Sequence, residues 1–80
     1  MNYSDKKLFP TSDISLSAFL CLRYPIKSIN RQNAKRILFV FEKDKNFDSY
    51  VEGYWSGSIK VQPLQFYQSL KMLKGRIYND

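Results

Sequence analysis

Apolar side chains recur with helical spacing between residues 47 and 55. Their positions follow i, i+3, i+4, i+7 and i+8, the spacing of one apolar face of an amphipathic helix. Gly57 follows the run at the place where helices commonly end, and Asp44 or Asn46 precedes it as a candidate N-cap. The pattern therefore predicts a helix whose buried face consists of Phe47, Tyr50, Val51, Tyr54 and Trp55.

A second run of helical spacing follows Pro63, a residue that suits the first position of a helix. It predicts a C-terminal helix that packs through Phe66, Leu70, Leu73 and Ile77. Residues 58–62 lie between the two helices and alternate polar and apolar side chains. That alternation predicts either a short third strand or an extended connection.

The N-terminal part of the chain also predicts one helix. Thr11 or Ser12 is the expected N-cap, and Asp13 is well placed against the positive end of the helix dipole. Pro25 ends the helix around residues 23–25, because the residue before a proline is disfavoured in helical geometry. Its apolar face is expected to contain Ile14, Ala18, Cys21 and Leu22, widened by Leu16, Phe19 and Leu20.

Two strands are predicted at residues 26–30 and 36–41, joined by a polar turn around residues 32–34. One side of the second strand is expected to carry Ile37, Phe39 and Phe41, and the other side Leu38 and Val40. If helices cover only one face of this hairpin, Leu38 and Val40 would be exposed and would favour a dimer.

The chain is therefore expected to be one small α+β domain over residues 1–80, with an ordered core at about 3–78. The expected order is helix, β-hairpin, helix, a short third strand if residues 58–62 pair, and a C-terminal helix. Eighty residues bury only about 60 to 65% of the surface exposed by the unfolded chain, so self-association is another route to burial.

Positive charge is concentrated in two places. The chain has 13 Lys and Arg against 7 Asp and Glu, for a net charge of +6. The hairpin carries no acid between residues 26 and 41, and a cationic ribbon of this kind can lie on a phosphate backbone. The same residues also suit a solvated turn that protects an edge strand. The candidate nucleic-acid ligands here are Lys27, Arg31, Lys35 and Arg36.

The last helix carries the second concentration, on a stripe separate from its apolar seam. Aromatic rings there can stack on bases while ammonium groups meet phosphates. An ordinary surface helix would carry the same residues. The candidates are Tyr67, Lys71, Lys74 and Tyr78.

Catalysis is disfavoured by the composition. The chain has no histidine, the commonest general acid or base. Cys21 therefore has no such partner and is expected to be a small buried hydrophobic residue on the apolar face of its helix. Asp44, Asp48 and Glu52 recur at every fourth position, but helix capping and solvation explain them better than a metal does. We expect no catalytic residues, no metal site, no cofactor and no small-molecule substrate.

Four segments together resemble a known family. In order they are Thr11-Ser12-Asp13-Ile14-x-Leu16-x-Ala18-Phe19-Leu20, Arg36-Ile37-Leu38-Phe39-Val40-Phe41-Glu42, Val51-Glu52-Gly53-Tyr54-Trp55-Ser56-Gly57 and Phe66-Tyr67-x-x-Leu70-Lys71-x-Leu73-Lys74-x-Arg76-Ile77-Tyr78. The chain is similar to short bacterial, phage and mobile-element proteins described only as a domain of unknown function. Members usually carry a glycine or an acid between the two strands, whereas residues 31–36 here are basic and polar. The resemblance implies a fold and a genomic setting, and no activity.

These observations favour a small non-enzymatic binding module that contacts nucleic acid through the hairpin tip and the last helix. The alternative is a protein-interaction module, either a homodimer or an inhibitor of a host protein, with no role in nucleic-acid binding. A single cysteine, the absence of a secretion signal and the absence of a long apolar run favour a cytoplasmic protein without a membrane role.

Overall fold

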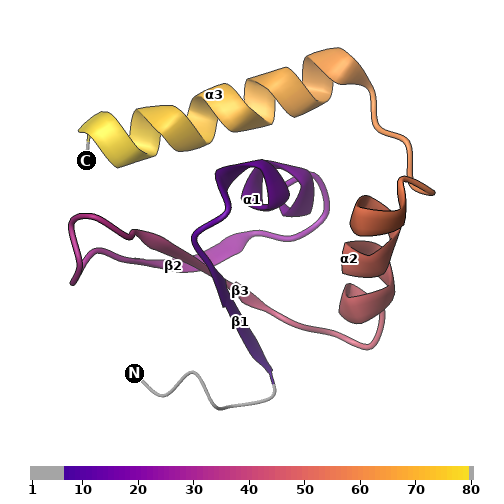
Figure 1. Ribbon diagram of the computed structural model, residues 1–80, viewed down its shortest axis with the longest axis horizontal. Helices are drawn as coiled ribbons and strands as arrows, with labels where there is room; N and C mark the ends of the chain where they lie inside the picture. Colours follow the sequence, from indigo (N-terminus) through magenta and orange to yellow (C-terminus); the bar gives the residue numbers. More distant parts are fainter. Residues whose placement is uncertain (1–6, 80) are drawn as a thin grey trace.

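The computed structural model describes residues 7–79, with side chains from residue 7 to residue 78. The confirmed α+β class is built from three strands and three helices in this part of the chain (Figure 1). Residues 3–6 of the expected ordered core lie outside the described residues. The elements are β1 (Leu8–Thr11), α1 (Ile14–Leu20), β2 (Ile26–Asn30), β3 (Leu38–Glu42), α2 (Phe47–Ser56) and α3 (Pro63–Asn79).

The sheet is antiparallel and has the order β1-β3-β2, with β3 in the centre. The third strand is therefore β1, which the sequence pattern did not predict. Of the two alternatives for residues 58–62, the extended connection is correct. Pro10 is compatible with β1 because this is an edge strand, where an amide hydrogen is not needed on the outer side.

The two faces of β3 have different surroundings. Phe39 and Phe41 belong to the main apolar core together with residues of all three helices. Val40 alternates to the opposite face, beside Pro10 and Ser28 on the neighbouring strands, and is also fully buried. Val40 is therefore not exposed, so the condition under which it would favour a dimer is not met.

Helix α1 is shorter than predicted and starts from a different cap. Asp13, rather than Thr11 or Ser12, is the N-cap, and its Oδ1 accepts a hydrogen bond from the Leu16 amide at 3.0 Å. Thr11 instead ends β1, and its Oγ1 accepts from the Asp13 amide at 3.1 Å. The helix ends at Leu20, earlier than the predicted end at residues 23–25. Turns connect it to Pro25.

Helix α1 lies between α3 and the sheet and also contacts α2 (Figure 1). All five residues from Leu16 to Leu20 are buried, so this helix has no solvent-facing side over that length. The Ser69 hydroxyl of α3 donates to the Ala18 carbonyl at 2.8 Å, and the Tyr50 hydroxyl of α2 donates to the Phe19 carbonyl at 3.1 Å. Both longer helices are therefore attached to the backbone of α1 as well as to its side chains.

Helix α2 confirms its predicted range but not all of its predicted buried face. Gly57 ends it with a left-handed φ of 73°, and Tyr50 stacks on Phe19 with ring centroids 4.2 Å apart. Trp55, in contrast, is 61% exposed and makes an edge contact with Tyr54 at 4.9 Å. The prediction that Trp55 is buried is wrong because the core contacts of α2 centre on Phe47 and Tyr50, and Trp55 lies at the margin of that contact.

Replacing Ser69 with Ala removes the donor to the Ala18 carbonyl and should lower the free energy of unfolding by about 1–2 kcal/mol. Urea denaturation followed by circular dichroism measures this loss. Gln68→Ala changes the neighbouring exposed residue of the same helix and should cost less than about 0.5 kcal/mol. Equal losses for the two variants would show that this hydrogen bond does not hold α3 against α1.

Candidate nucleic-acid interface

The hairpin tip, residues 31–37, is shaped by asparagine side chains that hydrogen-bond to nearby backbone. Asn30 Oδ1 accepts from the Gln32 amide and Asn33 Oδ1 accepts from the Lys35 amide, each at 2.9 Å. The Asn33 carbonyl also accepts from the Arg36 amide at 3.0 Å. These local bonds order the turn without using the side chains of Lys35 and Arg36, both of which are exposed.

Arg31 connects the tip to the C-terminal end of α3. Its Nη2 donates to the Arg76 carbonyl at 2.8 Å, and its Nη1 donates to the Ile77 carbonyl at 3.5 Å. A guanidinium there satisfies carbonyls that the last helical turn leaves without intrahelical partners, and it complements the negative end of the helix dipole. These hydrogen bonds give Arg31 a structural role, and its role as a nucleic-acid ligand stays a prediction.

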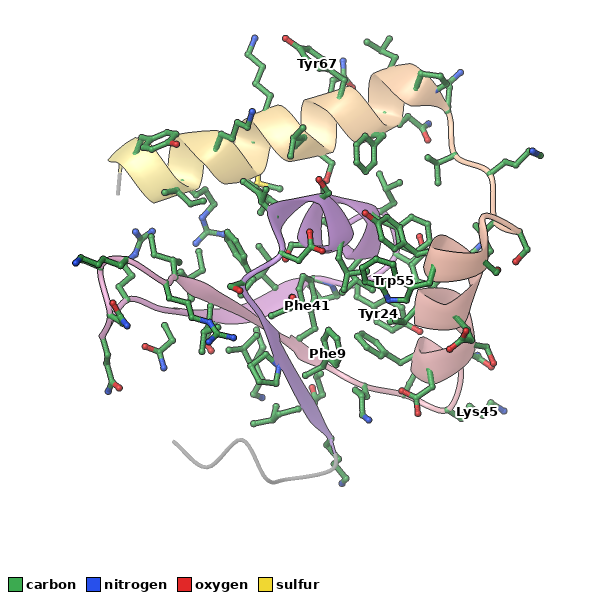
Figure 2. The ribbon with its side chains drawn as sticks, in the orientation of Figure 1. Phe9, Tyr24, Phe41, Lys45, Trp55 and Tyr67 are labelled. Atoms are coloured by element: carbon green, nitrogen blue, oxygen red, sulfur yellow. The ribbon has the colours of Figure 1, made fainter. Side chains whose placement is uncertain are left out.

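The predicted stripe on the last helix is present. Tyr67, Lys71, Lys74 and Tyr78 are all exposed, whereas the seam of Phe66, Leu70, Leu73 and Ile77 is partly or fully buried. Tyr67 points away from α1 and the sheet (Figure 2). The two tyrosines are 58% and 79% exposed, so their rings are accessible for stacking.

Lys27 does not belong to the tip. It lies at the opposite end of β2, beside a bulge between Ile26 and Ser28, and lines a cavity of about 310 Å³ with Glu42 and Asp44. Lys27 is close in sequence to the cations of the tip, but most of strand β2 separates it from them in space. We therefore remove Lys27 from the candidate interface.

Acids are absent from two basic parts of the molecule and are concentrated in another part. The hairpin from residue 26 to residue 41 and the whole of α3 contain no acid, whereas α2 and the segment before it contain several. The hairpin tip and the C-terminal end of α3 lie at one side of the molecule, and α2 lies at the other (Figure 1). The tip and α3 contain the cations Arg31, Lys35, Arg36, Lys71, Lys74 and Arg76, whereas α2 and the segment before it contain the acids Glu42, Asp44, Asp48 and Glu52 together with Lys43 and Lys45.

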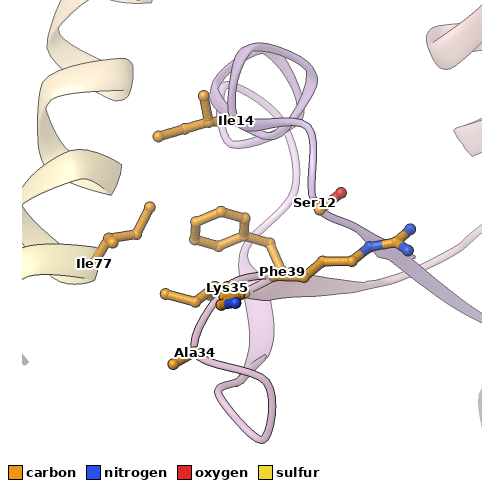
Figure 3. A pocket seen from close by; sticks show the side chains of 8 residues that line it. Ser12, Ile14, Ala34, Lys35, Phe39 and Ile77 are labelled. Carbon is orange, nitrogen blue, oxygen red and sulfur yellow. The ribbon is translucent and has the colours of Figure 1, made fainter.

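A cavity of about 360 Å³ opens between the tip, the start of α1 and the end of α3 (Figure 3). We call it the tip cavity. Its polar lining residues are Ser12, Lys35 and Arg36, and its apolar lining residues are Ile14, Ala34, Ile37, Phe39 and Ile77. Arg36 also borders a cavity of about 420 Å³ that is lined by Asn30, Gln32, Asn33 and Leu38.

The sequence pattern missed the tip cavity because its walls come from four separate segments. It had assigned Phe39 and Ile77 to the core, and both also line this opening. Ser12 had been considered only as a helix cap. Core packing brings Ile14, Phe39 and Ile77 together, and the Arg31 contact brings the tip against the end of α3.

The described residues contain no cluster of three or more His, Cys, Asp or Glu that could hold a metal ion. Asp44 instead accepts hydrogen bonds from the Tyr24 hydroxyl at 2.7 Å and the Asn46 amide at 2.9 Å. Within residues 7–79, no helix is both long and apolar enough to cross a membrane.

A family model for a domain of unknown function, DUF5659, matches residues 6–79. The chain belongs to the DUF5659 family. The match covers every described strand and helix, so this DUF5659 domain comprises the sheet, the three helices and the candidate interface. Comparisons with curated proteins and with solved structures gave no match.

Replacing Arg31 with Ala should loosen the tip from α3 and expose the carbonyls of Arg76 and Ile77 to water. We expect faster amide hydrogen exchange at residues 31–37 and a loss of about 0.5–1 kcal/mol in the free energy of unfolding. Lys27→Ala removes an exposed cation from the other end of the same strand and is the control. Unchanged exchange at the tip in Arg31→Ala would contradict the proposed attachment.

The Tyr24–Asp44 hydrogen bond predicts a pH dependence of stability. The hydrogen bond from the Tyr24 hydroxyl, and to a smaller extent that from the Asn46 amide, lowers the pKa of Asp44 below its usual 3.8. The stabilisation that these bonds to the ionised carboxylate provide is therefore present above pH 3.8 and is lost as the pH falls below it. Burial first, and the hydrogen bond to Asp44 second, raises the pKa of Tyr24 from 10.0 to about 12. The stabilisation that the protonated hydroxyl provides to the folded state is therefore lost as the pH rises between those two values.

Tyr24→Phe should therefore flatten both the acid and the alkaline limbs of the stability profile, as measured by denaturant unfolding across pH. Tyr78→Phe removes the hydroxyl of an exposed tyrosine and should leave both limbs unchanged. A Tyr24→Phe profile parallel to that of the original chain would exclude this bond as their origin.

Proposed function

We propose that this DUF5659 domain is a non-enzymatic module that binds nucleic acid through the hairpin tip and the outer face of α3. The observation that carries the proposal is the Arg31 contact with the Arg76 and Ile77 carbonyls. It brings Lys35 and Arg36 to the same side of the molecule as the C-terminal half of α3. The proposed setting is a cytoplasmic protein of phage or mobile-element type.

Charge supports this proposal. Nucleic acid binds proteins mainly through its phosphates, and a cationic surface gains affinity by releasing the counterions that surround them. Lys35, Arg36, Lys71 and Lys74 are exposed and lie on two elements without acids. The acids near α2 lie at the other side of the molecule, which favours the approach of a polyanion with the tip and α3 facing it (Figure 1).

Aromatic side chains on α3 support it further. Tyr67 and Tyr78 are exposed on the same stripe as Lys71 and Lys74, so two ammonium groups lie between two rings along about three turns of helix. Exposed rings next to cations suit unpaired bases, which stack on aromatic side chains while their phosphates meet the charges. The proposed contact residues are Lys35, Arg36, Tyr67, Lys71, Lys74 and Tyr78.

The non-enzymatic part of the proposal rests on the chemistry of the side chains. The sequence has no histidine, and burial raises the pKa of Cys21 to about 11 despite the charge of Arg76, so its thiol stays protonated at neutral pH. Asp44 is engaged by Tyr24 and Asn46 at the start of α2. The Cys21 thiol is thus a partly buried side chain, and the Asp44 carboxylate orders the turn before α2.

The exposure of Trp55 favours a second candidate, a protein-interaction module. A tryptophan that is 61% exposed and stands against Tyr54 offers the kind of aromatic anchor that dominates many protein interfaces. Its partner would be a second copy of the chain or a host protein. A chain that binds no nucleic acid but sediments as a dimer only when Trp55 is present would support this alternative.

The nucleic-acid proposal predicts binding that weakens steeply as salt rises. Lys35→Ala/Arg36→Ala and Lys71→Ala/Lys74→Ala should each weaken binding at low salt by roughly tenfold and reduce the slope of log affinity against log salt by about 1–2. Fluorescence anisotropy with labelled single strands and duplexes of DNA and RNA measures both quantities.

The matched control is Lys45→Ala/Lys60→Ala, which removes the same net charge from exposed positions on either side of α2. Lys45 lies at the start of α2, on the side away from the tip (Figure 2). We expect this control to retain most of the affinity. Absence of binding at low salt, or an equal loss in the control, would reject the proposed interface.

A further inference from the structure

The tip cavity is lined by both apolar and cationic side chains. Ile14 comes from α1, Phe39 from β3 and Ile77 from α3, and these three side chains converge on one opening (Figure 3). Lys35 and Arg36 line the same opening from the tip, and both are exposed. A ligand that fills this space needs an apolar body and a negative charge close to it.

The size of the cavity restricts the ligand further. Its volume of about 360 Å³ lies near the lower end of the range for small-molecule sites, which is about 300–1,000 Å³. A nucleic-acid duplex, whose major groove alone is about 12 Å wide, is far too large to enter it. One nucleotide can enter, because its planar base is apolar on both faces and its phosphate is anionic.

The surroundings provide a path for the rest of a strand. Ile77 lies in the same helical turn as Lys74 and Tyr78, which are exposed on the stripe that we propose as a contact surface. A strand whose base occupies the cavity can therefore continue along α3. Asp13 lies in sequence between Ser12 and Ile14, two residues that line the cavity. Its Oδ1 accepts the Leu16 amide hydrogen as the N-cap of α1.

We propose that the tip cavity holds one unstacked base of a single-stranded nucleic acid, with the adjoining phosphate on Lys35 and Arg36. This inference rests on the proposed function and sharpens its substrate class from nucleic acid in general to single strands. A duplex must lose stacking and pairing to supply such a base, so it binds only through the outer charges. The Arg31 contact holds the two walls of the cavity together.

The test fills the cavity without changing charge. Ala34 lines the tip cavity from the exposed turn, so Ala34→Trp places an indole in it. Gln32→Trp is the matched control, because Gln32 is exposed in the same turn but lines the neighbouring cavity. Ser12→Trp fills the tip cavity from its other wall and gives a second reading if Ala34→Trp disturbs the turn.

The probes are labelled oligothymidylate, oligouridylate, an abasic strand of equal length and a blunt duplex, each measured by anisotropy with the full chain. Ala34→Trp and Ser12→Trp should each weaken binding to the base-bearing strands by roughly tenfold and leave abasic-strand and duplex binding within about twofold. Gln32→Trp should bind all four probes like the original chain. The thymidylate and uridylate arms show whether DNA or RNA is preferred.

Two outcomes overturn the inference while the proposed function stands. The first is that the original chain binds the base-bearing and abasic strands with equal affinity. The second is that both cavity-filling variants bind the base-bearing strands like the original chain, while their affinity still falls as salt rises. Absence of binding to every probe at low salt is a different result, which overturns the proposed function and this inference together. Circular dichroism of each variant confirms that the fold is retained.

Discussion

The arrangement of this domain depends on the complete burial of a short helix. Seven residues form too short a helix to be stable alone in water, and five of those in α1 are buried in succession. The carbonyls near its C-terminal end are satisfied by hydroxyls of the two longer helices, at Ala18 and Phe19. Because those bonds set where α2 and α3 rest, they also determine that the end of α3 reaches the hairpin.

The candidate interface depends in turn on Arg31, a cation whose hydrogen bonds join two elements of the fold. Arg31 holds the tip against α3, and Lys35 and Arg36 are thereby placed near the end of a helix that lies about forty residues away in sequence. The positive charge of residues 26–41 is thus divided by role. One residue joins two elements, Lys27 stands apart beside acids, and the remaining two face solvent at the tip.

The sequence predicted the elements whose periodicity is long and regular, and it failed where tertiary contacts decide. Helices α2 and α3 and the β-hairpin follow from ten or more patterned residues each. Strand β1 has only four residues, one of them Pro10, so it carries too little pattern to detect. The burial of Trp55, the cap of α1, the contacts of Arg31 and the tip cavity depend on which elements meet, and no local pattern encodes that.

The way in which Arg31 holds α3 has a consequence for how this protein can vary. Its guanidinium donates to main-chain carbonyl oxygens, which every amino acid possesses, and not to the side chains of residues 76 and 77. Substitutions at the end of α3 can therefore alter the chemistry of the surface while the tip keeps its position. The contact therefore needs an arginine at position 31 but no particular residue at positions 76 and 77, so changes in surface chemistry can accumulate at the end of α3 without loss of the fold.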